Sequence, residues 1–168
     1  MNINELRNEI NFGLENLESI YQSISKFSQQ EIEERVKVSA LTYECLGYYN
    51  AIEHLIIRVL KHSKTEISSG PFSHRDILKA FISLLSERGI KEDEGTIKVI
   101  ENLMAFRHIA TKIYGFLIDW NKLKFIINEI EINHNKIKGI FAEVLRSINE
   151  DDETGCDNHQ LCQGWDSR

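Results

Sequence analysis

Four side chains that could do chemistry lie close together in residues 106–120, FRHIATKIYGFLIDW. They are Arg107, His108, Lys112 and Tyr114. At about 100° per residue, Arg107 and Tyr114 are separated by roughly 700°, so both project from one face of a helix. His108 and Lys112 are four positions apart and share a neighbouring face. Side chains of these types could bind an anion and transfer a proton.

A plain structural role also accounts for the same four side chains. Basic groups near the C-terminus of a helix stabilise its dipole by a fraction of a kcal/mol. Tyr114 would then be an ordinary half-buried aromatic residue. Spacing alone favours this structural interpretation over a chemical one.

The pattern of apolar residues predicts the helices that position this segment. Apolar residues recur every three or four positions, which is typical of amphipathic helices. Pro71 is the only proline in the chain, and this scarcity favours long helices. The predicted helices cover about residues 3–28, 31–61, 73–88, 95–114 and 122–148. Short connections between them predict an all-α fold, an antiparallel bundle of about five helices.

Size and composition are those of one ordinary domain. The chain has 168 residues, of which 42% are apolar, enough for a hydrophobic core. Its apolar runs are far shorter than the roughly 20 residues that a membrane span needs. The N-terminal segment lacks the apolar block of a signal peptide. We therefore expect a cytoplasmic protein without a membrane contact.

The net charge of -6 belongs to the end of the chain. From residue 149 onward there are six acidic residues and one arginine, so residues 1–148 hold 20 acids and 19 bases. A nearly neutral body argues against a protein that coats nucleic acid, although a local basic site remains open. We predict a helical domain over residues 1–148 and a disordered acidic tail over 149–168.

The cysteines and most histidines favour structural roles. Cys45 lies in an apolar helical stretch and is expected in the core. Cys156 and Cys162 lie in the polar tail and do not make a tetrahedral ligand set with His159, so no metal or other cofactor is expected. Three further histidines are expected on helix surfaces: His54, His62 and His134.

The order of residues in 106–120 resembles the signature of HEPN domains, and more narrowly that of the HepT-like toxins. The motif is an Arg followed a few residues later by His, one further residue and Tyr. Arg107 and Tyr114 match the Arg and the Tyr, whereas Lys112 stands at the His position.

Two other segments are similar to the same family. LGYYNAIEHLIIRVLKH, residues 46–62, resembles the second helix, in which an aromatic pair precedes a Glu, here Glu53. SSGPFSHRDILKAF, residues 68–81, resembles the start of the next helix, with His74 and Arg75. The resemblance covers about residues 3–148.

The resemblance implies a metal-independent endoribonuclease that works as a homodimer, with two copies of the motif in one cleft. Arg107 would clamp the phosphate of an RNA substrate. The implied partner is a nucleotidyltransferase antitoxin of the MNT type, which attaches AMP to the motif tyrosine, here Tyr114. His74 and Arg75 would belong to the same cleft or lie on a solvent face, and Glu53 would be an accessory residue.

Lys112 leaves two functional hypotheses open. Lysine side chains ordinarily carry a proton at neutral pH, so Lys112 would be a poor base, although it could bind phosphate or donate a proton. Either His108 supplies the imidazole chemistry, or the chain is a weakened or inactive toxin, natural or engineered. The alternative to a ribonuclease is a binding module that holds the antitoxin, a nucleotide or RNA without cleavage. A purely structural bundle is the third interpretation.

Overall fold

A computed structural model describes residues 2–65, 73–91, 94–112 and 118–156 of the chain. These residues form five helices: α1 (Ile3–Gln29), α2 (Glu34–His62), α3 (Ser73–Glu87), α4 (Glu94–Lys112) and α5 (Trp120–Cys156). No strand occurs in the described part of the chain. The all-α fold predicted from the sequence is therefore confirmed.

Local signals set several helix ends. Asn2 and Glu5 form a reciprocal capping box at the start of α1, with hydrogen bonds of 2.8 and 3.0 Å. Gly89 ends α3 at a φ of 66°, a conformation that side chains with a Cβ rarely adopt. Asp119, immediately before α5, accepts a hydrogen bond from the backbone N–H of Asn121 at 3.0 Å.

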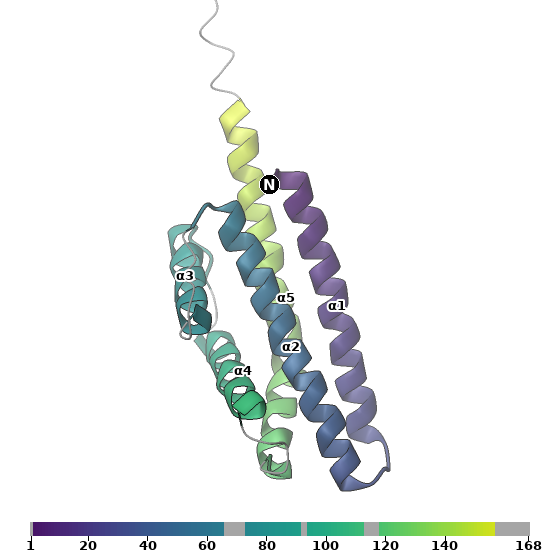
Figure 1. The fold of residues 1–168 in the computed structure, drawn as a ribbon. Helices are drawn as coiled ribbons and strands as arrows, with labels where there is room; N and C mark the ends of the chain where they lie inside the picture. Colours follow the sequence, from purple (N-terminus) through teal and green to yellow (C-terminus); the bar gives the residue numbers. More distant parts are fainter. Residues whose placement is uncertain (1, 66–72, 92–93, 113–117, 157–168) are drawn as a thin grey trace, which may run out of the picture.

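The helices are arranged around α2, which contacts each of the other four. The long helices α1, α2 and α5 lie side by side, and the shorter α3 and α4 cover the flank of α2 away from α1 (Figure 1). α1 approaches α2 closely at Gly13, where an added Cβ would lie 2.5 Å from Cδ2 of Leu55. This arrangement leaves one face of α2 turned toward α3 and α4.

The core is filled by apolar side chains from all five helices. The largest fully buried ones include Tyr48 of α2, Phe81 of α3 and Phe141 of α5. The rings of Phe81 and Phe141 stack with centroids 5.6 Å apart. Each such side chain contributes roughly 1.5–3 kcal/mol by leaving water, so the buried stripes hold the helices in register.

Cys45 lies in the core as predicted, and burial raises the pKa of its thiol to about 12.

The prediction that His134 lies on a helix surface was wrong, because this residue is only 3% exposed. It lies four residues after Ile130 and three before Ile137, on the buried face of α5. Tyr48 and Glu18 satisfy its two ring nitrogens, each at 2.9 Å, which makes burial of a polar ring tolerable.

The last helix continues beyond its predicted end. α5 extends through residues 149–156, which the sequence analysis assigned to a disordered tail. No proline or glycine interrupts residues 149–154, and Asn149 accepts a hydrogen bond from Arg7 of α1 at 2.8 Å. Residues 157–168 lie outside the described residues, so the domain boundary at 148 remains a prediction.

None of the helices in the described ranges is both long enough and apolar enough to cross a membrane.

Candidate functional site

Three helices bring one ionisable side chain each to a common point. Arg107 comes from the C-terminal part of α4, His74 from the first turn of α3 and Glu53 from the middle of α2. Nη1 of Arg107 lies 2.9 Å from Nε2 of His74. Nδ1 of His74 in turn makes a short hydrogen bond to Oε1 of Glu53. The three segments that resemble HepT-like toxins thus meet in space through these side chains.

Two further residues of α2 complete this cluster. The hydroxyl of Tyr49 donates to Oε1 of Glu53 at 3.1 Å. The amide oxygen of Asn50 accepts from Nε of Arg107 at 3.1 Å. The ring of Tyr49 lies 6.0 Å from the guanidinium carbon of Arg107, within the range of a cation–π contact. Glu53 and Tyr49 are buried, and they form the wall against which His74 and Arg107 pack.

A pocket of about 620 Å³ opens beside this cluster, between α3 and α4. Its ionisable lining residues are His74, Arg75, Arg107, His108 and Lys112. Among the residues described, no acidic side chain lines it. Three groups that carry positive charge, together with two imidazoles, make this pocket suited to an anionic ligand. We call it the cationic pocket.

The site residues predicted from the sequence fall into three groups. Arg107, His108, Lys112, His74 and Arg75 all line the pocket. Glu53 lies behind it and touches His74. The predicted modification site, Tyr114, lies outside the described residues.

Sequence reasoning missed two members of the cluster, Tyr49 and Asn50. The spacing of Tyr49 and Glu53, four residues apart, would have placed both on one face of a helix. No comparable signal in the sequence connects Asn50 to Arg107, because the two are far apart in the chain and meet only when α2 packs against α4.

An apolar groove adjoins the cationic pocket. It lies between α4 and the start of α5, has a volume of about 430 Å³, and shares Ala105 and Ile109 with the cationic pocket. Its other apolar lining residues are Phe106, Ile118, Phe125 and Ile126. Phe125 is 53% exposed, so this groove presents an uncovered apolar surface next to the candidate site.

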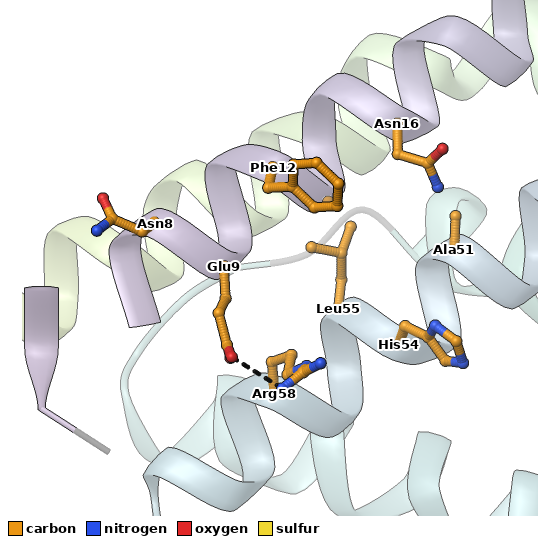
Figure 2. Close-up of a pocket in the computed structure, with 9 residues that line it drawn as sticks. Asn8, Glu9, Phe12, Asn16, Ala51, His54, Leu55 and Arg58 are labelled. Atoms are coloured by element: carbon orange, nitrogen blue, oxygen red, sulfur yellow. Dashed lines mark hydrogen bonds and ion pairs between the residues drawn. The ribbon is translucent and has the colours of Figure 1, made fainter. Parts of the chain in front are cut away.

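A further pocket, of about 400 Å³, lies between α1 and α2 (Figure 2). The exposed ring of Phe12 overlies it, and an ion pair of 2.9 Å between Glu9 and Arg58 crosses one end. It shares no lining residue with the cationic pocket and provides a separate surface for control substitutions.

Comparison with protein-family models matches residues 40–148 to the model of the HepT-like proteins, which is more than half of the chain. The chain belongs to the HepT-like family. The match includes every described residue of the cluster and of the cationic pocket, and it begins after α1. No curated protein and no solved structure gave a significant match in the other two comparisons.

Membership of the HepT-like family makes this a toxin-like protein of the HEPN type. The family implies, in general terms, dimerisation and a partner within a toxin–antitoxin system. In this HepT-like chain, Arg107 and Lys112 stand at motif positions and line the cationic pocket. Tyr114, at the third motif position, lies outside the described residues.

Proposed function

We propose that this HepT-like protein is the toxin of a toxin–antitoxin pair and cleaves RNA without a metal ion. The cleavage site is the cationic pocket between α3 and α4, brought opposite its copy in a homodimer. The observation that supports this most directly is the arrangement of Arg107. Its guanidinium is held by His74 and Asn50 at the wall of a pocket lined by further cationic groups.

The chemistry follows from the lability of RNA itself. A base removes the proton of the 2′-hydroxyl, and the 2′-oxygen attacks the adjacent phosphorus. The bond from phosphorus to the 5′-oxygen breaks, and an acid protonates that oxygen. The products are a 2′,3′-cyclic phosphate and a 5′-hydroxyl. Because negative charge accumulates on the phosphorane, a guanidinium next to it lowers the barrier.

Two exposed residues of α4 are candidates for the proton transfers. His108 lines the pocket, and its imidazole, unlike that of His74, makes no hydrogen bond to Arg107. His108 is therefore the candidate base. Lys112, one turn further along α4, lines the same pocket and is the candidate proton donor or phosphate ligand. Arg75 adds a positive charge from α3, which attracts the phosphate backbone.

A homodimer accounts for the apolar groove between α4 and α5. The groove has an exposed aromatic residue, Phe125, and continues into the cationic pocket through Ile109. A second copy that covers this groove would place its own pocket beside the first. Two sets of cationic groups would then face one RNA strand. The occupant proposed for the groove is therefore another copy of this chain.

The proposed partner is a nucleotidyltransferase antitoxin of the MNT type, which transfers AMP to Tyr114. Tyr114 follows Lys112 by two positions in the sequence. The added phosphate would bring negative charge to the segment that binds RNA and would compete for the cationic groups.

The test is RNA cleavage by the purified chain in the presence of EDTA. The wild type should cleave, and Arg107→Ala should reduce the rate by at least about 100-fold, the usual loss when one stabilising donor is removed. Arg35→Ala is the matched control, because Arg35 is an exposed arginine roughly 20 Å along α2 from Asn50. Abolition of cleavage by EDTA, or equal rates for the Arg107 variant and wild type, would contradict the proposal.

A second candidate function is binding without cleavage, favoured by Lys112 at the motif histidine position. In that case the cationic pocket binds RNA, a nucleotide or the antitoxin, and the chain does not turn over substrate. The two functions differ in the response to Lys112→His, which is discussed below.

A further inference from the structure

The hydrogen bond between Arg107 and His74 indicates where the proton of His74 lies. A guanidinium is only a donor, so the nitrogen that faces it must offer a lone pair. Nη1 of Arg107 lies 2.9 Å from Nε2 of His74, and that nitrogen therefore carries no proton. The proton of the neutral ring must then be on Nδ1.

Glu53 fixes this tautomer from the other side. Oε1 of Glu53 accepts a hydrogen bond from Nδ1 of His74. The same carboxylate accepts from the hydroxyl of Tyr49, and burial raises the pKa of Tyr49 well above its ordinary value, so the phenol keeps its proton. Because only 10% of its side chain is exposed, Glu53 has little access to water and depends on these two donors for its hydrogen bonds.

We infer that Glu53 and His74 are positioning residues that act in series on Arg107. Glu53 holds His74 with its proton on Nδ1, and His74 uses the lone pair on Nε2 to hold one amino group of Arg107. Asn50 holds Nε of the same guanidinium at 3.1 Å. This inference rests on the proposed function, in which Arg107 binds the reacting phosphate.

The consequence is a defined orientation for the rest of the guanidinium. Arginine has five N–H donors, and two of them bind Asn50 and His74. Within the described part of the chain, Nη2 makes no hydrogen bond, so both of its N–H groups are left for a ligand in the pocket. A guanidinium fixed in advance loses less entropy when phosphate binds than a free one.

The direct test is the tautomer of His74, read from the nitrogen chemical shifts of its ring in ¹⁵N-labelled full-length protein. We expect wild type to have a protonated Nδ1 and an unprotonated Nε2. Glu53→Gln keeps the shape but removes the charge, and its amide can also donate to Nδ1, so it should lose this single tautomer. Glu9→Gln is the matched control, because Glu9 pairs with Arg58 on the other side of α2 and should leave His74 unchanged.

Kinetics test the effect on Arg107. Misplacing a catalytic group slightly costs up to about 100-fold, so Glu53→Gln should lower kcat by roughly 10- to 100-fold with a smaller change in KM. His74→Gln retains an acceptor toward Arg107 and should keep more activity than His74→Leu. Equal melting temperatures among the His74 variants would exclude general unfolding as the cause.

The outcomes separate this inference from the proposed function. Failure of wild type to cleave RNA would contradict the proposed function, while the ring nitrogens of His74 would still decide the inference. A proton on Nε2 in wild type, or the same single tautomer in Glu53→Gln, would overturn the inference even if RNA is cleaved. Equal activity of His74→Gln and His74→Leu would overturn it as well.

Discussion

The imidazole of His134 in α5 lies flat against the ring of Tyr21 in α1, with centroids 4.0 Å apart and planes 7° apart. The same imidazole forms hydrogen bonds with Tyr48 of α2 through Nδ1 and with Glu18 of α1 through Nε2. This polar cluster therefore joins three helices inside the bundle, and none of its members lines the cationic pocket. Its role is to stabilise the fold, and the titration of Glu18 allows this stabilisation to be measured as a function of pH.

Acid should weaken the contribution of Glu18 to stability. Hydrogen bonds from His134 and then Lys138 lower the pKa of Glu18 from 4.5 to about 2. Because the folded-state pKa is the lower one, the stabilisation is fully present above about pH 4.5 and is lost as the pH falls toward 2. Urea unfolding should thus give a free-energy difference between wild type and Glu18→Gln that shrinks over this range.

Glu15→Gln is the control for Glu18, since Glu15 is an exposed acidic residue one turn earlier on α1. It reports the general effect of removing a carboxylate from this helix. A difference between wild type and Glu18→Gln that stays constant from about pH 5 to pH 2 would exclude the hydrogen bonds to the Glu18 carboxylate as the cause.

Lys112→His should raise RNA cleavage if the pocket is otherwise competent. The substitution restores an imidazole at the motif position, and general acid–base groups typically contribute about 10²- to 10⁴-fold. We expect a rise in the rate of at least about 100-fold, the lower end of that range. Lys98→His on the same helix is the control, because 68% of the Lys98 side chain is exposed and it lies outside the pocket. An unchanged rate with RNA binding retained would favour the binding module.

Ile109→Asp should convert a dimer into monomers. Ile109 lies where the apolar groove meets the cationic pocket, and a charged carboxylate there would lose its water if a second copy covers the groove. Light scattering after size-exclusion chromatography measures the mass directly. Phe12→Asp is the control, because Phe12 is 74% exposed but overlies the separate pocket between α1 and α2. Monomers of the Phe12 variant, with dimers of the Ile109 variant, would place the interface on α1 and α2 instead.

Tyr114 should be the residue that receives AMP. Cleavage by trypsin after Lys112 and Lys122 yields a peptide in which Tyr114 is the only tyrosine. After incubation with a cognate nucleotidyltransferase and ATP, mass spectrometry should find AMP on this peptide in wild type and not in Tyr114→Phe. Tyr43→Phe is the matched control, since Tyr43 is 75% exposed on α2 and should not affect modification. AMP on other peptides alone would refute the assignment.

Apolar periodicity predicted the helices because burial of one face is the main force that forms them. The error at His134 has a specific origin. Its position between Ile130 and Ile137 indicates the buried face, whereas the polarity of histidine by itself favours a surface position. The pattern was the better guide, because Tyr48 and Glu18 supply the hydrogen bonds that make burial possible.

The cluster around Arg107 was predicted only in part. Family resemblance selected Arg107, His74 and Glu53, yet it did not indicate which atoms bond to which. Those pairings depend on how α3 and α4 pack against α2. Asn50 and Tyr49 were missed for the same reason: a side-chain amide or phenol in a helix has many other uses, and the sequence does not indicate its partner.

The central place of α2 has a consequence for genetics. This helix contacts all four other helices and also carries Asn50 and Glu53, which touch the residues of the cationic pocket. If expression of this chain stops growth, a selection for surviving colonies should recover many changes in α2 of two kinds. Some would remove the folded protein from the cell, and others would leave its abundance intact. Immunoblotting of the survivors would sort the two kinds and would identify residues of α2 that serve the pocket alone.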